Sequence, residues 1–331
     1  MSDITIRKAQ HITLALQAGS QTNKEPFVDV GLPYLTLPEL DLREVETGTE
    51  LLGKKLRQPL IIASMTGGVD FAEKINVNLA AAAQECGVAM GVGSQRVALE
   101  RPEVIKTFSR VRKFAPTAVV FANMGAVQLN YGRTEEDYQR IVDMVEADGL
   151  FIHVNPMQEA MAPDGDTNFK FLISKIEKLI KVIKVPVFIK EVGNGIDAET
   201  AKKLIDVGAA GIDVAGVGGT SWTWIEGKRA GNESLAKWFA DFGVTTEEAI
   251  RGSVRVRKEA KKKFKIIASG GIRNPIQGLK AHLLGADYYS AARPFLEAAL
   301  LGSEEAVKLI DDWEKGLRIA MFGIGRKTWE K

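Results

Sequence analysis

The sequence predicts an α/β protein of the (β/α)₈ TIM-barrel class, from two observations. Eight short apolar runs recur along the chain, and amphipathic segments of helical periodicity separate most of them. The runs are rich in Val, Ile and aromatic residues and do not alternate in polarity, which is typical of parallel strands buried on both faces. We expect strands at 59–64, 87–92, 117–124, 149–156, 185–192, 210–217, 265–272 and 286–293.

The segments between the runs have the features of helices. Residues 134–149 begin with acidic side chains, which the helix dipole favours, and residues 169–184 space their apolar positions three and four apart. Residues 197–208 end on Gly208, a suitable C-terminal cap. Repeated strand–helix units favour a closed barrel. An open doubly wound sheet is disfavoured because no Gly-x-Gly-x-x-Gly turn follows the first strand.

The 331 residues fit one barrel domain with additions. We expect a turn-rich N-terminal extension over 1–58, the barrel core over 59–302 and a helical C-terminal segment over 303–331. A long insertion, 218–264, follows the sixth strand. Such a loop emerges at the carboxyl-terminal face of a barrel, where it forms a lid, a wall of the active site or a subunit contact.

Composition narrows the possible partners and the compartment. With 44 Lys and Arg against 42 Asp and Glu, the net charge of +2 gives no overall attraction to nucleic acid or to an anionic membrane. The single cysteine, Cys86, excludes an intramolecular disulfide and lies in an apolar helical run, where we expect it to be a buried structural residue. No secretory signal and no apolar run of roughly 20 residues is present. We therefore expect a cytoplasmic protein.

Polar residues gather where the predicted strands end. They occupy positions 64–68, 93–96, 123, 153–159, 190–191, 218–220, 269–273 and 291–294. Because all these strand ends open at one face of a barrel, we expect them to form the active site. A phosphate site is predicted by the backbone N–H groups of two strand ends, although the glycines could also only make a tight turn. These ends are Ser269, Gly270, Gly271 and Ile272 after the seventh strand and Ala291, Ala292 and Arg293 at the eighth.

Three groups near these ends could carry chemistry. Lys190 closes an apolar strand and either stabilises an anionic ligand, such as a reduced flavin, or pairs with Glu191. His153, Gln158 and Glu159 share one loop and could hold Mg²⁺ with a diphosphate, since Mg²⁺ requires few protein carboxylates. They could equally be structural.

The N-terminal segment carries a small basic cluster of Arg7, Lys8 and His11. Such a cluster is by default a solvated charged face. It would contribute to a site only if the N-terminal segment folds over the mouth of the barrel.

Seven motifs together resemble those of the FMN-dependent, type 2 isopentenyl-diphosphate isomerases. They occur in the same order, as RKAQHI at 7–12, MTGG at 65–68, GSQR at 93–96, HVNPMQE at 153–159, KEVGNG at 190–195, GVGGTSW at 216–222 and ASGGIRN at 268–274. The resemblance implies interconversion of isopentenyl and dimethylallyl diphosphate with no net redox change. It also implies reduced FMN, NADPH as reductant, Mg²⁺ and a homotetramer or homo-octamer.

The resemblance also implies residue roles, with flavin N5 as acid and base. Catalytic roles fall to Gln158, His153 and Lys190. Substrate would be held by Arg7, Lys8, His11, Ser94, Arg96, His153, Asn155 and Gln158, and the metal by Glu159. FMN would be bound by Ala63, Ser64, Met65, Thr66, Ser94, Asn123, Lys190, Thr220, Gly270, Gly271, Ile272, Arg273, Ala291 and Ala292. Two positions depart from many relatives, Met157 in place of Leu and Ala215 in place of Ser.

Three other functions compete with this one. An FMN-dependent 2-hydroxy-acid oxidase needs a histidine base near the end of the seventh strand, and residues 265–274 contain none. An enzyme like IMP dehydrogenase needs a nucleophilic cysteine in a loop, whereas Cys86 lies in a predicted helix. A non-catalytic flavin- or phosphate-binding barrel is the third alternative, against which the polar residues at so many strand ends argue.

Overall fold

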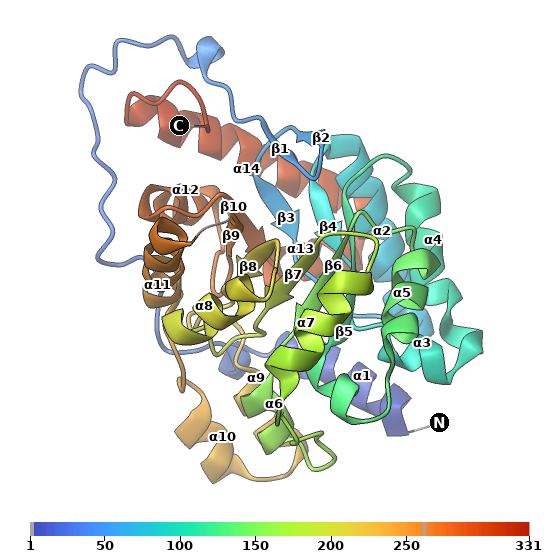
Figure 1. Ribbon diagram of the computed structural model, residues 1–331. Coiled ribbons are helices and arrows are strands. Elements are labelled where there is room, and N and C mark those ends of the chain that lie inside the picture. Colours follow the sequence, from blue (N-terminus) through green and yellow to red (C-terminus); the bar gives the residue numbers. More distant parts are fainter. Residues whose placement is uncertain (1–2, 261–262, 331) are drawn as a thin grey trace.

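The computed structural model describes residues 3–260 and 263–330. Its centre is a closed ring of parallel strands in the order β10-β3-β4-β5-β6-β7-β8-β9, surrounded by helices (Figure 1). The strands are β3 Leu60–Ile62, β4 Ala89–Gly91, β5 Val120–Gly125, β6 Gly149–His153, β7 Val187–Lys190, β8 Gly211–Asp213, β9 Lys265–Ala268 and β10 Tyr288–Ala291. The predicted barrel is confirmed. Each strand begins within its predicted run, and only β5 extends past its run, by one residue.

Helices follow the strands as the amphipathic segments indicated. They are α2 Asp70–Cys86, α3 Arg96–Glu100, α4 Lys106–Phe114, α5 Glu135–Met144, α6 Pro156–Met161, α7 Leu172–Val182, α8 Ala198–Asp206, α9 Trp222–Arg229, α10 Glu233–Phe239, α11 Thr246–Glu259, α12 Pro275–Leu284 and α13 Arg293–Leu301. Local signals fix their ends. Capping boxes at Thr134 and Thr245 start α5 and α11, and Gly208, with φ of 106°, follows the end of α8. Within the described residues, no helix combines the length and apolar character that a bilayer crossing requires.

The N-terminal segment has more regular structure than its turn-rich sequence indicated. It contains helix α1 Asp3–Ala15, short 3₁₀ turns at Ala18–Ser20 and Leu42–Glu44, and an antiparallel hairpin of β1 Thr49–Leu51 and β2 Lys54–Leu56. Helix α1 contacts α9 at one end of the barrel, whereas the hairpin lies at the other end (Figure 1). The sequence analysis did not predict α1, because its apolar periodicity is weak. Its contacts with distant residues stabilise this helix more than its own sequence does.

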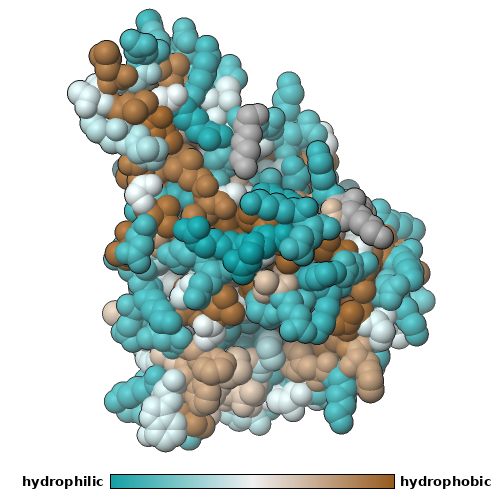
Figure 2. Space-filling view, turned by 60° about the vertical axis from the view of Figure 1, so that its left-hand side comes forward, coloured by the Kyte–Doolittle hydropathy of each residue, from teal (hydrophilic) through white to brown (hydrophobic). Residues whose placement is uncertain are grey.

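The chain closes with a long helix and a returning tail. Helix α14, Ser303–Gly323, packs on α2, α12 and α13. Beyond it, Trp329 is buried and its indole N–H donates to the carbonyl of Asp287 over 3.0 Å, while Thr328 pairs with Glu46. The surface seen in Figure 2 is largely hydrophilic, with apolar side chains gathered in smaller groups.

Aromatic side chains fill the barrel at the end covered by the hairpin. Phe121 and Phe151 stack with ring centroids 4.3 Å apart, and Phe188 meets both rings edge-on, at 5.3 and 6.0 Å. All three are buried and share a cluster with Leu51 and Leu56 of the hairpin. The barrel is therefore solid at this end, and a ligand can enter only from the carboxyl-terminal end of the strands.

This packing predicts the effect of truncating one ring. Phe151→Ala should lower the free energy of unfolding by about 3–5 kcal/mol, because a buried aromatic leaves a cavity when it is removed. Chemical denaturation monitored by circular dichroism measures this change. Phe171→Ala, on an exposed side chain at the start of α7, is the control and should stay within about 0.5 kcal/mol of wild type. Equal effects of the two substitutions would contradict this account of the core.

Candidate active site

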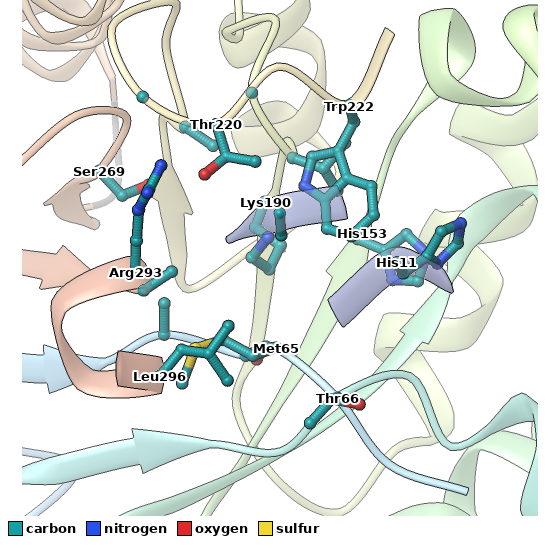
Figure 3. Close-up of a pocket in the computed structure, with 18 of the residues that line it drawn as sticks. His11, Met65, Thr66, His153, Lys190, Thr220, Trp222, Ser269, Arg293 and Leu296 are labelled. Atoms are coloured by element: carbon teal, nitrogen blue, oxygen red, sulfur yellow. The ribbon is translucent and has the colours of Figure 1, made fainter. Parts of the chain in front are cut away.

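A cavity of about 730 Å³ opens at the carboxyl ends of the barrel strands. Its size lies in the range of sites for cofactors and small molecules. In Figure 3, Lys190 lies between Met65 and Thr220, with His153 and His11 on one side and Ser269 and Arg293 on the other. The lining therefore combines groups from several strand ends with groups from α1.

Every site residue predicted from the sequence lines this one cavity. They are Arg7, Lys8, His11, Ala63, Ser64, Met65, Thr66, Ser94, Arg96, Asn123, His153, Asn155, Gln158, Glu159, Lys190, Thr220, Gly270, Gly271, Ile272, Arg273, Ala291 and Ala292. The fold thus brings together side chains separated by nearly the whole length of the chain.

Helix α1 lies over the mouth of the cavity and is held there by polar contacts. Lys8 Nζ donates to the carbonyl of Ser94 over 3.1 Å, and His11 Nε2 donates to Glu226 Oε1 over 2.9 Å. Arg7 pairs with Asp164 at 3.3 Å and with Glu226 at 3.4 Å. The basic cluster of the N-terminal segment is therefore part of the cavity wall and not a solvated face.

Glu226 is a central residue of this wall that the sequence analysis missed. Its side chain, on α9, is fully inaccessible to solvent and accepts hydrogen bonds from His11, Arg7, Gln158 and Arg229. Burial alone would raise the pKa of Glu226, but these partners outweigh it and lower the pKa to about 2. The sequence offered little signal, because Glu226 lies within a helix of the insertion and its partners are distant in the chain.

Gln158 is held in one orientation by its neighbours. Its Nε2 donates to Glu226 Oε1 over 3.2 Å, and its Oε1 accepts from Asn155 Nδ2 over 3.0 Å. Asn155 Nδ2 also donates to Glu159 Oε1 over 2.8 Å, and the second oxygen of Glu159 accepts from the backbone N–H of Asp166 over 2.8 Å. An amide and a carboxylate are thus fixed side by side at the cavity wall.

The cationic groups of the cavity oppose one another's charges. Burial, followed by repulsion from Arg96 and Arg7, lowers the pKa of Lys8 to about 8. Burial, followed by Lys190, Arg96 and Lys8, lowers the pKa of His153 to about 3. A bound anion would relieve this repulsion, so the site favours a negatively charged ligand.

His153 is neutral and has a defined tautomer. Its Nδ1 lies 2.9 Å from Asn123 Oδ1, while the amide nitrogen of Asn123 donates to the carbonyl of Val92 over 3.2 Å. Since the amide oxygen of Asn123 can only accept, His153 Nδ1 carries the proton. Nε2 is then the acceptor nitrogen of the ring.

Lys190 does not form the salt bridge that was its alternative role. Its Nζ donates to the backbone carbonyl of Glu191 over 2.7 Å, and in the described part of the chain it has no ion pair. The Glu191 carboxylate instead accepts from the backbone N–H groups of residues 192–195. Burial lowers the pKa of Lys190. The negative charges of Asp213, on the adjacent strand, and of Glu191 act in the opposite direction and raise it, but less than burial lowers it. The buried amino group of Lys190 is therefore available to an anionic ligand.

The two glycines after β9 make a tight turn and also line the cavity. Gly270 and Gly271 have φ of 102° and 87°, and a Cβ on either would lie 2.1 Å from the carbonyl oxygen of Gly216 or Gly218. Only glycine fits this contact between two loops. Nearby, the hydroxyls of Ser64 and Ser290 are buried in the cavity lining without a hydrogen-bond partner among the described residues. Unpaired buried polar groups of this kind suit a polar ligand.

The structure also bears on the competing functions. Cys86 is buried against α14, where burial raises the pKa of its thiol to about 11, so it is a structural residue. His282 lies in α12, 3.9 Å from the ring centroid of Trp329, and is absent from the cavity lining. Among the described residues, no three His, Cys, Asp or Glu side chains form a group that could hold a metal ion.

The chain is similar to known proteins over most of its length. The family described as FMN-dependent dehydrogenase matches residues 152–331. Proteins named isopentenyl-diphosphate delta-isomerase are similar over most of the chain. The one from Synechococcus is 44% identical, covering 99% of this chain and 94% of its own, and the one from Nostoc is 47% identical, covering 89% and 84%. A third, from Oceanobacillus iheyensis, is 41% identical, covering 99% and 94%.

Among solved structures, mandelate oxidase shares the fold. Its crystal structure superposes with a TM-score of 0.63 at 18% sequence identity, covering 98% of this chain and 94% of that chain. At this identity, the likeness concerns the architecture and not the reaction.

The environment of His153 predicts how it titrates. In two-bond ¹H–¹⁵N spectra, its ring should remain neutral with the proton on Nδ1 from pH 8 down to about pH 5, because its pKa is lowered from 6.5 to about 3. The His153→Gln variant identifies its signals among those of the three histidines. A titration midpoint near pH 6.5 would contradict the buried, positively charged environment described above.

Proposed function

This chain belongs to the family of FMN-dependent, type 2 isopentenyl-diphosphate delta-isomerases, and we propose that its cavity interconverts isopentenyl and dimethylallyl diphosphate with reduced FMN and Mg²⁺. We base this on one observation. The glycine-rich loop after β9, the buried Lys190 and the basic cluster of α1 line a single cavity. That cavity can therefore take a flavin phosphate and a second anionic ligand together.

FMN would be held by groups from seven strand ends. Its phosphate would lie against Gly270, Gly271, Ile272, Arg273, Ala291 and Ala292, and its ring would contact Ala63, Ser64, Met65, Thr66, Ser94, Asn123, Lys190 and Thr220. The unpaired hydroxyl of Ser64 and the ammonium of Lys190 support this assignment. Lys190 would offset negative charge on the reduced ring. When bound, reduced FMN would supply an electron-rich surface and the N5 atom as acid and base.

The diphosphate would bind on the cationic side of the cavity. Arg7, Lys8, His11, Ser94, Arg96, His153, Asn155 and Gln158 would hold it. Arg96 repels the charge of Lys8, and a diphosphate between the two side chains would offset that repulsion. Glu159 would bind Mg²⁺ through a carboxylate oxygen, with the diphosphate and water completing the coordination shell.

The side chains of the cavity also suit the proton transfers of the reaction. An alkene carbon is a weak base, so its protonation requires an acid held close to it in a site that excludes water. Gln158, fixed between Glu226 and Asn155, would orient the reacting group and assist in moving the proton. His153 and Lys190 would act beside it, His153 as a neutral ring and Lys190 as a buried charge. The cavity would stabilise the cation-like transition state electrostatically.

Three further features complete the proposal. NADPH would reduce the flavin before turnover without being consumed stoichiometrically. The single buried cysteine suits a cytoplasmic protein. The protein would assemble as a homotetramer or homo-octamer.

The reaction itself is the first test. Purified protein incubated anaerobically with FMN, Mg²⁺, NADPH and isopentenyl diphosphate should form dimethylallyl diphosphate, detected by NMR. Omission of Mg²⁺ or of reductant should abolish product, and NADPH use should not scale with product. Tight FMN binding without any product would reject the isomerase and leave a non-catalytic flavin-binding barrel or another flavin reaction.

The metal assignment predicts a separable effect of Glu159→Gln. This substitution should lower Mg²⁺-dependent turnover at least 100-fold, in the range found when a catalytic metal or its coordination is disturbed, while FMN absorbance and affinity are retained. Glu177→Gln, on an exposed carboxylate of α7 paired with Lys181, is the matched control and should behave as wild type. Unchanged Mg²⁺ dependence in Glu159→Gln would remove Glu159 from the metal site.

A further inference from the structure

The loop that joins α6 to α7, residues 162–171, returns toward the cavity. It carries Asp166, whose side chain is partly buried but which is absent from the cavity lining. Asp166 nevertheless contacts three residues that do line it, Arg96, Gln128 and Glu159. These neighbours can therefore transmit an influence of Asp166 to a bound ligand.

The carboxylate of Asp166 holds the guanidinium of Arg96. Asp166 Oδ2 lies 2.6 Å from Arg96 Nη1 and also accepts from Gln128 Nε2 over 3.2 Å. Arg96 Nη1 donates in addition to Gln128 Oε1 over 3.0 Å. Both acceptors engage the same nitrogen of Arg96, which leaves the donors of Nη2 for a ligand.

The backbone of Asp166 holds Glu159 as well. Its N–H donates to Glu159 Oε2, the oxygen not used by Asn155. Gly165 permits this approach, because a Cβ at this position would lie only 1.8 Å from the carbonyl oxygen of Glu159. The loop is therefore packed directly against α6.

Arg96 has one competing partner. Glu100, one turn further along α3, lies 3.9 Å from Arg96 Nε, beyond hydrogen-bonding distance. Arg133 already pairs with Glu100 at 2.6 Å. Without the Asp166 carboxylate, the strongest restraint on Arg96 would be lost, and its long side chain could turn toward Glu100 and away from the cavity.

We propose that Asp166 is a positioning residue, whose carboxylate fixes Arg96 and whose N–H fixes Glu159, so that a cation and a metal-binding carboxylate are presented together to a diphosphate–divalent cation complex. This inference rests on the proposed function, since it takes the anion to be a diphosphate. Asp166 lies outside the cavity lining, and we expect its replacement to weaken diphosphate binding. Charge alone would give the opposite result, because a carboxylate repels a nearby anion.

The test uses inorganic diphosphate with Mg²⁺, titrated into the FMN-loaded protein by calorimetry, together with steady-state kinetics. Asp166→Asn should weaken diphosphate binding and raise KM about 10-fold, with kcat changed less than about 3-fold, because the substitution acts on binding through Arg96. In an Arg96→Ala background, Asp166→Asn should have no further effect, since the two residues act as one unit. Asp206→Asn, which removes an exposed carboxylate paired with Lys202 on α8, is the matched control.

A second variant separates the two contacts of Asp166. Asp166→Asn keeps the backbone N–H and should leave the Mg²⁺ concentration for half-maximal activity within about 2-fold of wild type. Gly165→Ala displaces the loop from Glu159 and should raise that concentration about 10-fold. Circular dichroism and FMN affinity verify that both variants are folded.

Each other outcome has a definite meaning. Unchanged diphosphate binding in Asp166→Asn overturns the inference. Tighter binding also overturns it, because Asp166 would then compete with the diphosphate for Arg96. The inference is also overturned if Asp166→Asn weakens diphosphate binding by the same factor in Arg96→Ala as in wild type. Equal effects would mean that the substitution loosens the loop in general and does not act through Arg96. If the wild-type protein binds no diphosphate, the proposed function fails and the inference with it. Failure of the inference alone leaves wild-type binding and turnover intact.

Discussion

Parallel strands that close into a ring deliver all their carboxyl ends to one rim, and this constraint organises the protein. Because Phe121, Phe151 and Phe188 fill the opposite end of the barrel, the cavity of about 730 Å³ that the described residues enclose lies at that rim. Each strand contributes one or two polar groups there, such as Lys190 from β7 and His153 from β6. The site is therefore built from a few side chains at each strand end, and the barrel holds these side chains in place.

Charge balance is the second organising principle of the site. Burial and then the charges of Arg96 and Arg7 lower the pKa of Lys8. Burial and then the charges of Lys190, Arg96 and Lys8 lower the pKa of His153. Fully buried Glu226 offsets part of this positive charge and, through His11 and Arg7, holds α1 over the mouth. A cavity with such an excess of positive charge favours an anion, and desolvation strengthens that preference.

The fold alone does not choose the reaction. Mandelate oxidase has the same architecture at 18% identity, whereas the relatives at 41–47% identity are named as isomerases. The difference must lie in the side chains at the rim and in the segments that cover it. The rim of this protein carries an amide–carboxylate group on α6, and α1 and the insertion that holds Glu226 lie against it.

The sequence by itself determined the barrel, because buried parallel strands and amphipathic helices leave local patterns, and it determined the residues of the strand ends, because the topology fixes where those ends meet. Only the tertiary structure decided what lies between and above them. Helix α1 has little periodicity of its own and depends on contacts with α9, more than 200 positions away along the chain, as the His11–Glu226 pair shows.

Glu226 and Asp166 have the sequence context of ordinary surface acids, since their roles come from partners that only folding brings near. The alternatives for Lys190 were likewise separated only when its neighbour, Glu191, was found to bind the backbone of the following loop. The local sequence pattern therefore determines the barrel, whereas contacts between charged groups that are distant in the chain complete the site.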